Sequence, residues 1–265
     1  MYDILIKPFV RKMNMERASA VAMRYYKILG RIPLTRQISR ILHGNKPEGL
    51  EKEVFGLQFY NPVGLGAGLD KRGDVFDELE DLGFSFVEIG PLDAAATRHA
   101  IKNIQQKPHS DILAACIDKD FQTSFSLAYD FCDMFVIEIS DADDFRRILD
   151  PILDCRMTYD FYKPVILKLP ENATDTQTQA CVDYCRLSGV DGIQARSLHQ
   201  IRHIARISQK RFPIIANCHI KSVDEAMRAL DAGATLIEVR SGIVRHGPWF
   251  IRRILKHMSA ARATR

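Results

Sequence analysis

The chain has 265 residues, of which 46% are hydrophobic and 26% charged, a composition that fits a folded protein with a sizeable core and excludes a disordered one. No stretch approaches the roughly 18 apolar residues of a membrane-spanning helix, so integral membrane proteins are excluded too. Six cysteines lie in apolar segments without paired zinc-type spacing, and the first residues lack a secretory pattern. We therefore expect a soluble, cytoplasmic protein with reduced thiols.

The net charge of +4 conceals a strongly basic segment, residues 1–46, which we predict as a separate helical unit. It has ten basic residues against Asp3 and Glu16, a balance of +8, whereas the rest of the chain has a balance of −4. Apolar residues recur among the cations at helical spacing, which predicts a pair of basic amphipathic helices. These helices are suited to binding an anionic membrane surface or a protein partner. The alternative is that they dock on the next domain and leave their cations in solvent. The cations are Lys7, Arg11, Lys12, Arg17, Arg24, Lys27, Arg31, Arg36, Arg40 and Lys46.

Residues 47–265 form the second predicted domain. Residues 50–62 contain two short β-prone runs around Gly56, which predicts a small hairpin at the junction. Helical patterns then alternate with eight β-prone runs: Val63–Leu65, Phe86–Ile89, Ile112–Cys116, Met134–Ile139, Val165–Leu169, Gly192–Ala195, Pro213–Ala216 and Leu236–Val239. This alternation predicts an α/β protein with a parallel sheet, and eight repeats in about 200 residues favour a closed (β/α)8 TIM barrel. The alternative is an open sheet of six or seven strands.

Several motifs in fixed order resemble those of the membrane-associated (class 2) dihydroorotate dehydrogenases. The main ones are the glycine-rich segment Asn61–Gly73, the run Val87–Gly90 and the pair Ser241–Gly242. The resemblance covers nearly the whole chain. It implies a barrel that binds FMN and oxidises dihydroorotate to orotate in pyrimidine biosynthesis. It also implies that electrons pass to a quinone beneath the N-terminal helices, and that the protein lies peripherally on the inner face of a membrane.

The resemblance also implies site residues. The matching FMN-binding positions are Ala67, Gly68, Lys71, Lys168, Ser241 and Gly242, and Lys71 is also the implied substrate contact. Glycines without a Cβ atom let the backbone approach a flat ring closely, although a packed turn at the barrel rim explains the same glycines. Lys71 on a loop is equally compatible with a solvated cation.

The chain departs from the family pattern at the predicted top of the barrel. After Gly90, where the family has a long substrate-binding insertion, the sequence soon begins the next helical pattern. The fourth-strand motif Asn-Ile-Ser-Ser-Pro-Asn becomes residues 138–143, with Glu138 for asparagine and Asp141 at the position of the catalytic serine. A carboxylate can be a general base, so Asp141 is the candidate catalytic residue. Glu138, however, places negative charge where an electron-rich reduced flavin must form.

The phosphate site is altered as well. The family's Gly-Gly pair after the seventh strand is here Cys218–His219, whereas Ser241–Gly242 is retained. Because a Cβ atom disfavours positive φ, we expect a different loop conformation and weak or lost FMN binding. Alternatively, the His219 and Arg240 side chains bind phosphate directly, so a small anionic ligand at the barrel top is the predicted partner.

Other clusters predict neither a metal site nor nucleic-acid binding. Two cysteines and two histidines have i, i+4 spacing on predicted helices, but no third ligand is spaced nearby. A basic run alternates with isoleucine instead of aromatic residues, which favours a solvated helix face. These residues are Cys181, Cys185, His199 and His203 in the first set, and Arg202, Arg206, Lys210 and Arg211 in the second. Asp141, Asp143 and Asp144 lie at a helix start, where the helix dipole explains them.

Two functions follow from these observations. One is an FMN oxidoreductase, and the other, which the departures favour, is a pseudoenzyme of the same fold that binds or regulates a partner. Strand alternation places Lys168 inside the barrel near its top, with Glu138 on the neighbouring strand. We therefore predict an ion pair between them that fills the space of a flavin ring. The alternative is that Glu138 points outward.

Overall fold

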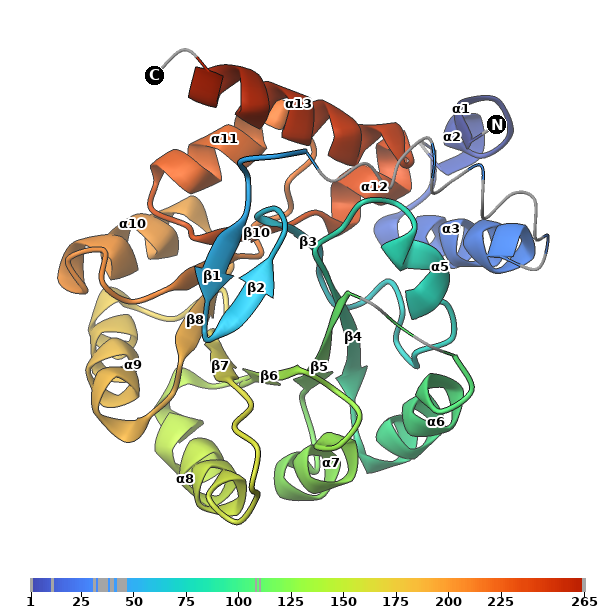
Figure 1. Cartoon of the computed structure of the whole chain (residues 1–265). Helices are drawn as coiled ribbons and strands as arrows, with labels where there is room; N and C mark the ends of the chain where they lie inside the picture. The colour runs from blue at the N-terminus through green and yellow to red at the C-terminus, as the bar shows by residue number, and fades with distance from the viewer. Residues whose placement is uncertain are drawn as a thin grey trace.

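The eight predicted strands close into one parallel barrel, in the order β10-β3-β4-β5-β6-β7-β8-β9 (Figure 1). The computed structural model describes residues 2–10, 12–30, 32, 38, 41, 47–107, 109 and 111–263. The barrel prediction is confirmed, and the open sheet is wrong. The strands are β3 (Val63–Leu65), β4 (Phe86–Leu92), β5 (Ile112–Ile117), β6 (Met134–Glu138), β7 (Val165–Lys168), β8 (Gly192–Ala195), β9 (Ile214–Ala216) and β10 (Leu236–Glu238).

Helices surround the barrel and follow the strands after short connections (Figure 1). Capping boxes begin two of them, with Thr174 before α9 and Ser222 before α11. Each cap satisfies backbone N–H groups that the first turn leaves unpaired. The helices are α5 (Phe76–Glu80), α6 (Ala94–Ile104), α7 (Phe121–Ala128), the 3₁₀ helix η1 (Ala142–Asp144), α8 (Phe145–Arg156), α9 (Asp175–Ser188), α10 (Leu198–Ile207), α11 (Val223–Asp231), α12 (Arg240–His246) and α13 (Trp249–Ala263).

A hairpin covers the end of the barrel where the strands begin. It consists of β1 (Lys52–Val54) and β2 (Leu57–Phe59), paired antiparallel as predicted (Figure 1). The Phe59 ring contacts the ring of Phe86, with centroids 5.5 Å apart. The Phe55 ring lies so close to Gly192 that a Cβ atom there would come within 2.5 Å of it. The hairpin therefore fills the lower barrel, and only the carboxyl ends of the strands are left for a site.

The basic N-terminal segment packs onto the barrel through a ring cluster. Its described part contains three helices instead of the predicted pair: α1 (Tyr2–Leu5), α2 (Lys7–Val10) and α3 (Met15–Gly30). The Tyr2 hydroxyl donates to the carbonyl of Val244 in α12, and its ring contacts the rings of Tyr25 and Tyr26. Five of the ten predicted cations lie outside the described residues, namely Arg11, Arg31, Arg36, Arg40 and Lys46.

Candidate functional site

Polar side chains form one layer inside the barrel, near the carboxyl ends of the strands. Strand pairing sets Glu138 opposite Lys168, and Lys168 opposite Gln194. The layer below is apolar and includes Phe86, Ala114, Met134, Val136 and Ile166. We call the polar layer, together with two residues just after the strands, the barrel network; its members are Glu88, Cys116, Glu138, Lys168, Gln194, Glu238, Arg196 and Asn217.

Glu138 is held between two cations. Its Oε2 lies 3.0 Å from Nζ of Lys168, and its Oε1 lies 3.0 Å from Nη1 of Arg196. The Cys116 thiol also donates to Oε2 of Glu138, at 3.4 Å. The predicted ion pair inside the barrel is therefore confirmed, and the outward orientation of Glu138 is wrong. The contact between Arg196 and Glu138 was not predicted, because Arg196 lies beyond the end of β8, where strand alternation no longer predicts the direction of a side chain.

A second part of the network joins two buried carboxyl groups through one amide. Nε2 of Gln194 donates to Oε2 of Glu88 and to Oε1 of Glu238, both at 2.8 Å. Asn217 donates to the other oxygen of Glu238 at 2.6 Å. Burial raises the pKa of Glu238 well above its ordinary value, and the neighbouring Glu88 raises it further. Both effects favour the protonated form of Glu238.

Lys168 balances the remaining charge of the network. Burial alone would raise the pKa of Glu88. The charge of Lys168, whose Nζ lies 3.6 Å from Oε1 of Glu88, outweighs burial and lowers that pKa, so Glu88 is ionised. Burial alone would lower the pKa of Lys168, yet Cys116, Glu88 and Glu138 together raise it. Two carboxylates, Glu88 and Glu138, thus face two cations, Lys168 and Arg196.

The glycine-rich turn after β3 is closely approached by side chains of this chain. A Cβ atom at Gly68 would lie 2.1 Å from Nη1 of Arg240, which donates to the carbonyl of Ala67 at 3.1 Å. A Cβ atom at Gly66 would lie 2.6 Å from Oε2 of Glu238. The turn therefore requires glycine for the reason expected from the sequence, close approach. The approaching groups here are Arg240 and Glu238.

The loop that replaces the family's Gly-Gly pair contains Cys218 and His219. His219 has φ of +54°, so it adopts the left-handed conformation despite its Cβ atom. Burial lowers the pKa of His219, and Arg240 lowers it further, so the imidazole is neutral at neutral pH. Ser241 is buried in the first turn of α12, and Gly242 packs against the ring of Phe250.

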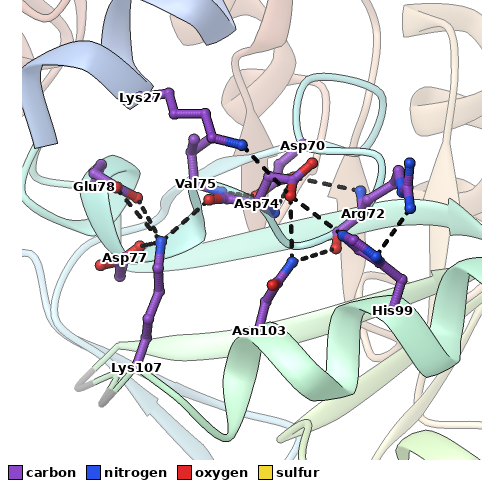
Figure 2. Close-up of polar contacts among 10 residues, drawn as sticks. All are labelled: Lys27, Asp70, Arg72, Asp74, Val75, Asp77, Glu78, His99, Asn103 and Lys107. Carbon is purple, nitrogen blue, oxygen red and sulfur yellow. Dashed lines mark hydrogen bonds and ion pairs between the residues drawn. The ribbon is translucent and has the colours of Figure 1, made fainter. Parts of the chain in front are cut away.

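Lys71 follows Asp70 on the loop between β3 and α5. Figure 2 shows the contacts by which Asp70 organises this loop. The buried Asp70 carboxylate accepts the backbone N–H groups of Asp74 and Val75, both at 2.8 Å. Burial raises the pKa of Asp70, and these N–H groups oppose the rise. Lys71 itself is exposed. The Asp-Lys-x-Gly motif thus folds the loop through its aspartate and leaves its lysine outside the barrel.

Figure 2 shows how the same loop binds the N-terminal helices. Lys27 of α3 lies 3.8 Å from Asp74, which also contacts His99 and Asn103 of α6. Lys71, Arg72 and Arg240 line a cavity of about 500 Å³ together with the α3 residues Met15, Glu16, Ser19, Ala20 and Met23. The predicted substrate lysine therefore faces a cavity beneath the N-terminal helices.

Asp141, the candidate catalytic residue, is exposed at the start of η1. Its Oδ1 accepts the backbone N–H of Asp143 at 3.0 Å. The structure thus gives it a capping contact and does not bring it into contact with the barrel network. The buried polar residues Glu88, Gln194 and Glu238 were missed from the sequence. Strand alternation could have found them, because each lies two residues beyond an inward-facing position of its strand.

Three further observations concern the other clusters in the described part of the chain. No group of three His, Cys, Asp or Glu residues there is arranged to hold a metal ion. All six cysteines are free thiols. Among the described residues, no helix is long and apolar enough to cross a membrane.

Comparison with known proteins points to one family. The family model for dihydroorotate dehydrogenase matches residues 169–261. A dihydroorotate dehydrogenase (quinone) of Christiangramia forsetii is 25% identical, with 96% of this chain and 97% of the relative covered. The enzyme of the same name from Chloroflexus aurantiacus is 26% identical, with 96% and 94% covered. The alignment with the first relative spans 331 residues, 66 more than this chain has, so that relative contains segments absent here.

Solved structures show the same fold. The DHODH of Eimeria tenella in complex with ferulenol has a TM-score of 0.72 and 16% identity, covering 85% of this chain and 90% of the other. Its ligand-free form gives a TM-score of 0.70, also at 16% identity, with 83% and 92% covered.

Proposed function

We propose that this chain is a divergent member of the dihydroorotate dehydrogenase family and a pseudoenzyme, which binds or regulates a partner instead of oxidising dihydroorotate. The single observation that carries the proposal is the position of Glu138 between Lys168 and Arg196. Its carboxylate lies where the resemblance expects a neutral asparagine beside the flavin. A reduced flavin is electron-rich, so a fixed negative charge at this position opposes its formation.

The residues present do not fit FMN in the way the resemblance implies. Arg240 lies against Gly68, so the turn expected to face a flat ring already faces a guanidinium group. At the opposite side of the mouth, Glu138 and Arg196 form an ion pair across the space that a ring would need. Placing FMN there would require these side chains to move and the pair to break.

The connections at the barrel mouth support the same proposal. β4 ends at Leu92 and α6 begins at Ala94, so Asp93 alone joins them. That residue caps α6 by accepting the N–H of Ala96 at 2.8 Å. The resemblance places the substrate-binding insertion in this connection. No segment there is long enough to close over dihydroorotate.

A working FMN oxidoreductase is the second candidate, and one observation favours it. Lys168 is at the end of β7, at the position of the family's flavin-contacting lysine, and neighbouring groups raise its pKa, so it is charged. Ser241 and Gly242 also stand at the family's phosphate positions in the first turn of α12. If FMN binds, it would supply the redox chemistry, and these three residues would hold it.

We propose a small anionic ligand at the rim of the barrel. Arg196 and Arg240 are both partly exposed there, whereas Glu88 and Glu238 are buried below. The cations at the rim therefore face solvent. A pseudoenzyme could bind its regulatory ligand in this place.

The visible absorption spectrum of the purified protein, before and after incubation with FMN, tests the proposal. We expect no flavin absorption after gel filtration, and no dihydroorotate oxidation above background with added FMN and a quinone. Glu138→Asn restores the family's residue and is expected to increase FMN affinity, measured by quenching of flavin fluorescence. Asp160→Asn, a neutralisation of an exposed carboxylate, is the matched control and should change nothing. A yellow wild-type protein that oxidises dihydroorotate would overturn the proposal.

A further inference from the structure

Helices α10 and α11 lie side by side on the outside of the barrel (Figure 1). A groove of about 370 Å³ lies between them. Four cationic side chains line it: Arg202 and Arg206 of α10, Lys210 just after that helix, and Arg228 of α11. All four are exposed, and the lining contains one carboxylate, Asp231. The groove is therefore strongly positive.

These cations are not neutralised within the part of the chain that the structure describes. None of the four forms an ion pair there with a carboxylate; Arg206 instead contacts Nδ1 of His203 at 2.9 Å. Guanidinium groups bind phosphate oxygens through pairs of parallel hydrogen bonds. Several cations converging from two helices thus form a surface suited to an anion with more than one phosphate.

The backbone at Lys210 gives a second, independent indication. Gln209 and Lys210 have φ of +55° and +58°, a conformation in which a Cβ atom is disfavoured. Lys210 N–H donates to the carbonyl of Ala205 at 2.8 Å, which ends α10 in a turn where glycine is commonly found. A lysine is retained here in a strained conformation, and its side chain lines the groove. Strained residues of this kind concentrate at functional sites.

The close approach of the two helices also depends on a special backbone position. Gly233, after α11, has φ of +115°, and a Cβ atom there would lie 2.6 Å from the Cβ of Ala205. Ala205 in turn lines the groove. The contact fixes the spacing between α10 and α11, so the groove is built by the fold.

We propose that this groove binds a small soluble molecule carrying two or more phosphate groups. The lining contains no aromatic side chain on which a base could stack, which disfavours single-stranded nucleic acid. The groove lies near the last turns of α10 and α11, at the end of the barrel where the strands begin. The barrel network lies at the opposite end, so the groove is a separate site and does not depend on FMN.

Calorimetric titration with pyrophosphate at physiological ionic strength tests the proposal. Wild-type protein is expected to bind it, and Arg202→Gln/Arg228→Gln to bind at least tenfold more weakly. The matched control is Arg186→Gln, which removes an exposed cation from the last turn of α9 and should bind like wild type. Because Arg186 also lies near the carboxyl end of a helix, this control shows whether pyrophosphate binding requires the cations of the groove or only a cation at a helix end.

Lys210→Gly separates function from stability. It relieves the left-handed strain and removes the cation, so we expect a higher melting temperature together with weaker pyrophosphate binding. A purely structural lysine would change the melting temperature alone, and that outcome would contradict the proposal. The absence of pyrophosphate binding by wild type, or an unchanged affinity in the double variant, would overturn it. Tighter binding of a single-stranded oligonucleotide that the double variant loses would overturn the small-molecule assignment.

Discussion

Lys168 and Glu138 are directly paired in the register of β7 and β6, and their charged groups lie 3.0 Å apart inside the barrel. Both oxygens of Glu138 contact a cation, because Arg196 lies 3.0 Å from the second one. Lys168 has a further neighbour in Glu88 at 3.6 Å. The pair is thus one link in a chain of alternating charges across the barrel.

Glu138→Ala is expected to reduce the free energy of unfolding by about 3 kcal/mol, because it removes the carboxylate that both Lys168 and Arg196 contact. This lies near the lower limit for a broken buried pair, since Glu88 still faces Lys168. The double variant Glu138→Leu/Lys168→Met should lose less free energy of unfolding than the sum of the losses in Glu138→Leu and Lys168→Met alone. Urea unfolding of all four proteins measures this coupling. Additive losses would show that the two residues do not interact.

Stability should depend on the protonation of Glu238. Its pKa is raised in the folded protein, by burial first and Glu88 second, from an ordinary value of 4.5. The protonated form is therefore favoured by folding. Its contribution is fully present below that value and is lost as the pH rises toward the raised pKa. Glu238→Gln imitates the protonated group, so its stability should depend less on pH as the pH rises above 4.5, measured by thermal melts. Parallel pH profiles for the two proteins would contradict this.

His219→Gly should stabilise the protein by about 1 kcal/mol, because glycine accepts the φ of +54° without a Cβ penalty. His219→Ala is the control: it removes the imidazole but retains the Cβ atom, and should give no such gain. Chemical unfolding of the three proteins distinguishes the backbone from the side chain. A loss of stability in the glycine variant would show that imidazole contacts outweigh the strain.

We propose that the N-terminal helices bind anionic membranes. Leu5, Phe9 and Ile28 are more than half exposed, and Lys7, Lys12 and Arg24 lie among them in the chain. Each cation near an anionic surface contributes about 1 kcal/mol. We expect co-sedimentation with vesicles containing phosphatidylserine at low salt, declining as salt rises and weakened by Phe9→Ser/Ile28→Ser. Equal recovery in the supernatant with neutral and anionic vesicles would exclude membrane binding.

The strands and most of the fold could be predicted from local pattern. All eight β-prone runs became strands, because each combines a short apolar run with a following helical period. The pair Lys168 and Glu138 was also predictable, since neighbouring parallel strands bring equivalent positions together.

The rest of the site depends on contacts that local pattern does not contain. Arg196 and Arg240 lie just beyond strand ends, where side-chain direction is set by tertiary packing. The left-handed conformation of His219 contradicts its residue type, because the loop between β9 and α11 overrides the local preference. Lys71 was assigned by resemblance alone, and the fold of the Asp70 loop leaves it exposed.

The hairpin of β1 and β2 has a consequence for how the chain assembles. It precedes the barrel in sequence, yet its Phe55 ring rests in the space that Gly192 leaves on β8, 137 positions later. The bottom of the barrel can therefore be sealed only after most of the strands have been synthesised and ordered. Until then, the Phe55 ring lacks the space that Gly192 provides. Barrel closure and burial of this ring accordingly occur together, late in folding, so burial of Phe55 reports that the barrel is complete.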